Sequence, residues 1–128
     1  MLRVAVLGCG RIGQMHAGNI ARHARTELAM IYDVHVPAAQ SVADALGAYI
    51  AADPQEVFAS DEVDAVLIAT ATPTHADYIE MAVASGKAVL CEKPIDLDLG
   101  RVDACAAKIA GTTVPIQLGF NRRFDPGH

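Results

Sequence analysis

Three glycines near the N-terminus have the spacing of a phosphate-binding loop. Residues 8–13 read Gly-Cys-Gly-Arg-Ile-Gly, directly after an apolar run and before a helical apolar pattern. In that position Gly8 can make the tight turn, Gly10 can let the backbone approach a pyrophosphate, and Gly13 can let helix and strand pack closely. The start of the helix would then face the anion. A glycine-rich turn without a ligand is the alternative.

An acidic residue follows at the distance that a bound adenosine ribose requires. Asp33 ends a second apolar run, twenty positions after Gly13, where its carboxylate can accept hydrogen bonds from both ribose hydroxyls. This favours NAD, because a 2′-phosphate 4 Å from the carboxylate would cost about 4 kcal/mol before screening. Neither Val34 nor His35 supplies an arginine for that phosphate. An ordinary carboxylate at a strand end, and a site for S-adenosylmethionine, are the alternatives; the third glycine favours a dinucleotide.

Three later loops could form the other walls of the site. They span residues 70–75, 91–94 and 120–126, and each follows a predicted strand. Ligands of open α/β sheets bind beyond the carboxyl ends of the strands. We therefore expect all three loops at the same edge as the glycines.

The elements that must position these loops alternate between strand and helix. Apolar runs predict strands at 2–7, 28–32, 49–50, 63–69, 88–91 and 114–119, separated by helical patterns. This predicts an α/β fold with a doubly wound parallel sheet, strand order 3-2-1-4-5-6, covered by helices on both faces. Pro115 would lie in the last strand, at the sheet edge, where a missing N–H is tolerated.

Composition narrows the class of protein. The chain has 128 residues, a net charge of −5 and 52% hydrophobic residues, and about two-thirds of its surface can be buried on folding. The acidic balance argues against nucleic acid, and no run approaches the ~20 apolar residues of a membrane span. Three widely spaced cysteines favour a reducing compartment, so we expect a cytoplasmic location. The five histidines lack the spacing of metal ligands, so no metal site is expected.

The chain resembles the NAD-binding domain of the glucose-fructose oxidoreductase, inositol dehydrogenase and MocA (Gfo/Idh/MocA) family. The glycine loop with His16, the loop with Thr72, Pro73 and His75, and the motif Glu92-Lys93-Pro94 occur in the expected order. The sequences around residues 91–98 and 119–125 look most like those of the inositol 2-dehydrogenases. The resemblance implies that residues 1–128 are the NAD-binding Rossmann domain at the N-terminus of a larger two-domain enzyme, and that the family's second α+β domain is absent from this chain.

The resemblance also implies the site residues. Lys93 would lie between the nicotinamide ribose and the substrate, hydrogen-bond the reacting hydroxyl and stabilise alkoxide character. Partial burial would lower its pKa; a solvated loop lysine is the alternative. Independently of the resemblance, Asn121, Arg122 and Arg123 form a local basic patch that could reach the cofactor or substrate, with Arg123 as the predicted substrate contact, or could equally be a solvated surface. The predicted cofactor-binding residues are Gly8, Gly10, Arg11, Ile12, Gly13, Asp33, Thr70, Thr72, Pro73, His75, Glu92 and Lys93.

The implied function is an NAD-dependent dehydrogenase acting on a secondary alcohol of a cyclic polyol or sugar, with myo-inositol as the first substrate to test. The family's catalytic histidine and aspartate belong to the second domain, so this chain alone should be inactive. The full-length enzyme is expected to be a homo-oligomer. A non-catalytic NAD-binding sensor or regulatory module is the alternative. His75 could also be a plain helix-start residue, and His16 a packing residue.

Overall fold

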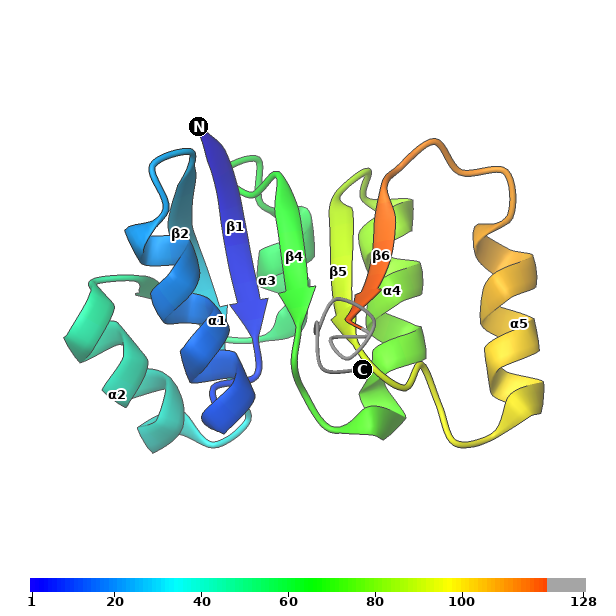
Figure 1. The fold of residues 1–128 in the computed structure, drawn as a ribbon, viewed down its shortest axis with the longest axis horizontal. Helices are drawn as coiled ribbons and strands as arrows, with labels where there is room; N and C mark the ends of the chain where they lie inside the picture. Colours follow the sequence, from blue (N-terminus) through cyan, green and yellow to red (C-terminus); the bar gives the residue numbers. More distant parts are fainter. Residues whose placement is uncertain (120–128) are drawn as a thin grey trace, which may run out of the picture.

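The computed structural model describes residues 1–119, and a sheet of six parallel strands forms its centre (Figure 1). The strands lie in the order β3-β2-β1-β4-β5-β6. The predicted doubly wound arrangement is therefore confirmed.

Strands and helices alternate along the described chain. Their bounds are β1 (Leu2–Leu7), α1 (Arg11–Arg22), β2 (Thr26–Tyr32), α2 (Val36–Leu46), β3 (Tyr49–Ile50), α3 (Pro54–Ala59), β4 (Ala65–Ile68), the 3-10 helix η1 (Thr72–Thr74), α4 (His75–Ala84), β5 (Ala88–Glu92), α5 (Leu99–Ile109) and β6 (Ile116–Gly119).

The central strand β1 is buried on both faces of the sheet. Successive side chains of a strand point to opposite faces. Val4 and Val6 accordingly pack in the core beneath α1 and α2, whereas Ala5 and Leu7 pack in a second core with residues of α3, α4 and α5. Such two-sided burial explains why the sequence of β1 is apolar without alternation.

Helices lie on both faces of the sheet, as predicted, but among residues 1–119 none covers β4, β5 and β6 on the face that carries α1 and α2. A groove of about 400 Å³ lies over β4, β5 and β6, on the side of the sheet that carries Ile20 of α1. The cause is the handedness of the crossovers. Right-handed connections toward β3 place α1 and α2 on one face, and those toward β6 place α4 and α5 on the other (Figure 1).

Two strands begin later than the sequence predicts. β4 begins at Ala65 rather than Val63, and the carbonyl of Val63 accepts a hydrogen bond from Lys87 Nζ at 2.9 Å. β6 begins at Ile116, one residue after Pro115, whose carbonyl accepts from the Val89 amide at 2.9 Å. Pro115 therefore lies directly before the edge strand β6 and not within it.

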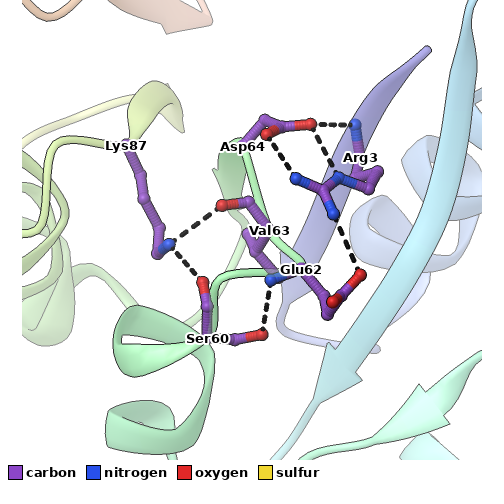
Figure 2. Close-up of polar contacts among 6 residues, drawn as sticks. All are labelled: Arg3, Ser60, Glu62, Val63, Asp64 and Lys87. Carbon is purple, nitrogen blue, oxygen red and sulfur yellow. Dashed lines mark hydrogen bonds and ion pairs between the residues drawn. The ribbon is translucent and has the colours of Figure 1, made fainter.

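Charged groups cross-link the starts of three strands, at the edge opposite the glycine loop. Figure 2 shows Arg3 of β1 donating to both carboxylate oxygens of Asp64, with Nε and Nη2 at 3.1 and 3.0 Å. Lys87, only 7% exposed, donates to the carbonyls of Ser60 and Val63. These contacts join the approaches to β4 and β5 to the start of β1.

None of the helices described here combines the length and the apolar character that crossing a membrane requires.

Candidate cofactor site

At the end of β1 the backbone passes so close to neighbouring backbone atoms that only glycine fits at positions 8 and 13. Gly8 has a φ of +102°, and a Cβ there would lie 2.4 Å from the carbonyl oxygen of Ala69. A Cβ on Gly13 would lie 1.7 Å from the carbonyl oxygen of Gly8. The two glycines therefore bring the end of β1, the end of β4 and the first turn of α1 into contact.

Gly10 differs from them because its surroundings are open. It is the N-cap of α1, and a Cβ added to it would meet no atom within 4 Å. Open space therefore lies beside its Cα, at the start of α1. Within residues 1–119, no side chain caps this helix start by a hydrogen bond. Arg11 and Ile12 follow in the first turn and are both exposed. Backbone N–H groups in such a turn can bind a phosphate.

Asp33 is held against the glycine loop by backbone amides. Its Oδ2 accepts from the Cys9 N–H at 2.7 Å, and its Oδ1 accepts from the His35 N–H at 2.8 Å. Each carboxylate oxygen has a further acceptor position, so the group can still accept from two hydroxyls. Burial and the charge of Asp33 raise the pKa of the Cys9 thiol to about 11, which keeps this cysteine neutral beside the carboxylate.

A cavity of about 500 Å³ joins the glycine loop to Asp33 and to the segment after β4. Four predicted residues line it: Gly8, Gly10, Asp33 and Thr70. Six further lining residues were missed from the sequence: Tyr32, Val34, Ala69, Ala71, Thr74 and Tyr78. Most of them adjoin a predicted residue along the chain, which is the signal that could have found them; Tyr78 lies one helical turn after Thr74 instead.

The segment after β4 turns sharply before α4. Thr72 and Pro73 lie in η1, outside the lining of this cavity. The Thr74 hydroxyl donates to the carbonyl of Ala71 at 2.7 Å and also bonds the Thr70 hydroxyl. These local bonds fix the wall of the cavity that Thr70 forms.

His75 is buried behind this segment. It is 2% exposed, with Nε2 at 2.8 Å from the carbonyl oxygen of Thr70 and Nδ1 at 2.7 Å from that of Pro94. Its ring thus connects the segment after β4 with the segment after β5. The described structure places it between two backbone carbonyls and not among the residues that line the cavity.

The segment after β5 presents Lys93 to solvent. Lys93 is exposed, so the expected partial burial is not found among the described residues, which supply no cover for it. Its neighbour Glu92 contacts His16 of α1, with Oε1 and Nε2 2.5 Å apart. The Lys93–Pro94 peptide bond is cis. Burial raises the pKa of the preceding Cys91 thiol to about 12, with a smaller effect of Glu92.

Arg123, with Asn121 and Arg122, lies outside the described residues. Within residues 1–119, no three His, Cys, Asp or Glu side chains are grouped so that they could hold a metal ion.

Comparison with known proteins identifies the family. Residues 2–120 match the family model described as "Oxidoreductase family, NAD-binding Rossmann fold". The inositol 2-dehydrogenase of Rhizobium meliloti (strain 1021) is 43% identical over 125 residues, which are 98% of this chain and 38% of that protein.

Solved structures agree with this match. The structure of a myo-inositol dehydrogenase from Corynebacterium glutamicum ATCC 13032 is 50% identical with a TM-score of 0.92, over 98% of this chain and 38% of that one. A scyllo-inositol dehydrogenase from Lactobacillus casei, solved with bound NAD(H) and scyllo-inositol, is 32% identical with a TM-score of 0.92 over the same shares. The chain thus spans about 38% of the length of these relatives.

The family match covers nearly the whole chain, and the strand order and glycine loop agree with it. This chain belongs to the Gfo/Idh/MocA oxidoreductase family, as an NAD-binding Rossmann domain.

Proposed function

We propose that this domain serves an NAD-dependent dehydrogenase that oxidises a secondary alcohol of a cyclic polyol or sugar, with myo-inositol as the first substrate to test. The observation that carries the proposal is the likeness to the Lactobacillus casei enzyme, whose structure contains NAD(H) and scyllo-inositol. The similarity to the inositol 2-dehydrogenase of Rhizobium meliloti supports the same substrate class.

The described residues fit a dinucleotide. The open side of Gly10 and the first-turn amides of Arg11, Ile12 and Gly13 would hold the pyrophosphate. Asp33 lines the adjoining cavity and keeps acceptor capacity for the adenosine ribose hydroxyls. Thr70 extends the same cavity toward the loop of Thr72, Pro73 and His75, which we assign to the nicotinamide side together with Glu92.

Lys93 is the residue of this chain that we assign to the chemical step. NAD, when bound, supplies the acceptor for the hydride. The ammonium of Lys93 donates a hydrogen bond to the reacting hydroxyl and stabilises the negative charge that develops on its oxygen. Its exposure in this domain leaves the amine accessible to a substrate. We propose that Arg123 also contacts the substrate.

The proton acceptor is assigned outside this domain. Because the relatives are much longer than residues 1–128, we infer that these residues form the N-terminal part of a two-domain enzyme. The second domain would supply the catalytic base. We further propose a cytoplasmic homo-oligomer, and the three cysteines of this chain are free and buried, in keeping with a reducing compartment.

A polyol panel tests the proposal. The full-length protein, of a length similar to that of its relatives, is mixed with NAD and with myo-inositol, scyllo-inositol or glucose. NADH formation is followed by absorbance. We expect NADH with at least one cyclic polyol. Tight NAD binding without oxidation of any polyol or sugar would contradict the proposed reaction and favour a sensor or regulatory module.

A further inference from the structure

Two histidines from distant elements contact the residues on either side of Lys93. His16 Nε2 lies 2.5 Å from Oε1 of Glu92, and His75 Nδ1 lies 2.7 Å from the carbonyl oxygen of Pro94. His16 belongs to α1 and His75 begins α4. The exposed Lys93 is therefore bracketed by two bonded neighbours.

The first contact fixes the side chain of Glu92. The side chains of His16 and Glu92 are only 20% and 24% exposed, so solvent competes weakly for their hydrogen bond. The other oxygen of the carboxylate, Oε2, packs against β6, because a Cβ added to Gly119 would approach it to 3.0 Å. Glu92 is thus held between α1, which begins at the glycine loop, and the edge strand.

The second contact fixes the backbone after Lys93. His75 is 2% exposed, and its other ring nitrogen faces the carbonyl of Thr70 at 2.8 Å. Carbonyl oxygens only accept hydrogen bonds and a neutral imidazole has one N–H, so the ring donates to one of these carbonyls at a time; the bond to Pro94 forms in the tautomer that carries the proton on Nδ1. The ring couples Pro94 to Thr70, which lines the cofactor cavity.

We propose that His16 and His75 are positioning residues that hold Lys93 at a fixed place relative to the cofactor loops. The inference rests on the proposed function, because it assigns these histidines to the geometry of the same site. His16 ties Lys93 to the helix that follows the glycine loop, and His75 ties it to the segment after β4. A displacement of about 1 Å at a reacting group can cost roughly 100-fold in rate, so two such ties matter for turnover.

Matched amide variants test each tie. The amide nitrogen of glutamine can occupy the place of histidine Nε2, and that of asparagine the place of Nδ1. His16→Gln keeps a donor for Glu92 and His16→Asn does not. At position 75 the order reverses, since His75→Asn keeps the donor for Pro94 and His75→Gln keeps only the one for Thr70. His23→Ala, an exposed histidine just after α1, is the control.

Turnover of the full-length protein should be higher in the variant that keeps the hydrogen-bond donor, which is glutamine at position 16 and asparagine at position 75. We expect His16→Asn and His75→Gln to lower kcat by roughly 10- to 100-fold, with the Kd for NAD changed less than about threefold. His16→Gln and His75→Asn should each turn over faster than its partner variant by a similar factor, and His23→Ala should match the wild type. A residue that only stabilises the fold would not separate kcat from cofactor affinity in this way, and thermal unfolding of each variant checks its fold.

A second readout does not depend on activity. NMR relaxation on residues 1–128 gives the backbone order at Lys93, where an order parameter near 0.85 means rigid and one below about 0.6 means flexible. We expect the order at Lys93 to fall in His16→Asn and His75→Gln and to be kept in their partners.

The outcomes separate the inference from the proposed function. Equal kcat and equal order in all four variants, with an active wild type, would overturn the positioning role alone. A wild type that binds NAD but oxidises no polyol would contradict the proposed function, and the order parameters would still decide whether the histidines hold Lys93.

Discussion

At the scale of single residues, the glycines of the loop have different tasks although they share one motif. Gly8 and Gly13 permit contacts between backbones, whereas Gly10 borders open space. The geometry therefore separates residues that build the site from a residue that leaves room for a ligand.

This difference predicts opposite effects of two alanine substitutions. Gly13→Ala forces a methyl group against the Gly8 carbonyl, and we expect it to lower the free energy of unfolding by about 2–3 kcal/mol. Gly10→Ala should leave stability within about 0.5 kcal/mol but weaken NAD binding, because the methyl occupies the approach of the pyrophosphate. Denaturant unfolding and calorimetry measure the two effects. Equal loss of stability in both variants would contradict the assignment.

Lys93 is the residue that we assign to the reacting hydroxyl. In the full-length protein, Lys93→Ala should lower kcat by about 100-fold or more, because a donor to the developing oxyanion is lost. The Kd for NAD should change little, since Lys93 is not among the residues that line the cavity beside Asp33. Lys108→Ala, an exposed lysine of α5, is the control. Unchanged turnover would remove Lys93 from the reaction.

At the scale of elements, the ion pairs at the starts of β1 and β4 hold the edge of the sheet opposite the site (Figure 2). Hydrogen bonds from the Arg3 side chain and amide lower the pKa of Asp64 to about 2, below its usual value of 3.8. The contribution of Asp64 to stability is therefore present above about pH 4 and is lost as the pH falls toward 2.

Substitution of the Asp64 carboxylate should change how the free energy of unfolding depends on pH under acidic conditions. Asp64→Asn should lower stability at neutral pH and flatten the fall in stability between about pH 4 and pH 2. Asp103→Asn, an exposed carboxylate of α5, should leave the slope unchanged. Denaturant unfolding at a series of pH values measures it. An Asp64→Asn variant with the wild-type slope would show that the ion pair does not couple to folding.

The elements were predictable because their signals are local. Apolar periodicity and the spacing of the glycines gave the strand order and the loop, and Tyr49–Ile50 is a strand at the predicted residues. The contact of His16 with Glu92 joins residues 76 positions apart, and it depends on how α1 and β5 meet. The same holds for Lys87, whose burial depends on the turn before β4, where it donates to the carbonyl of Val63, 24 positions earlier in the chain.

At the scale of the whole molecule, the domain contains a cofactor cavity but places Lys93 in the open. Residues 1–128 correspond to 38% of the length of the relatives described above. An exposed lysine that is assigned to a reacting hydroxyl needs further protein around it to exclude water and supply a base.

Residues 1–128 alone should therefore bind NAD but not oxidise inositol. We expect NAD to bind with a Kd of roughly 1 μM to 1 mM, the range typical of substrate KM values, and no NADH formation above background. The full-length protein is the positive control. Robust NADH formation by residues 1–128 would show that no second domain is needed.

We expect the glycine loop and Asp33 to bind NAD and to exclude NADP. Calorimetric titration of residues 1–128 with both dinucleotides measures this preference. We expect NAD to bind at least about tenfold more tightly, a difference of about 1.4 kcal/mol, because Asp33 repels a 2′-phosphate. Asp33→Ser combined with Val34→Arg should reverse this preference. Equal affinities for NAD and NADP in the wild type, unchanged by the double substitution, would show that Asp33 does not select the cofactor.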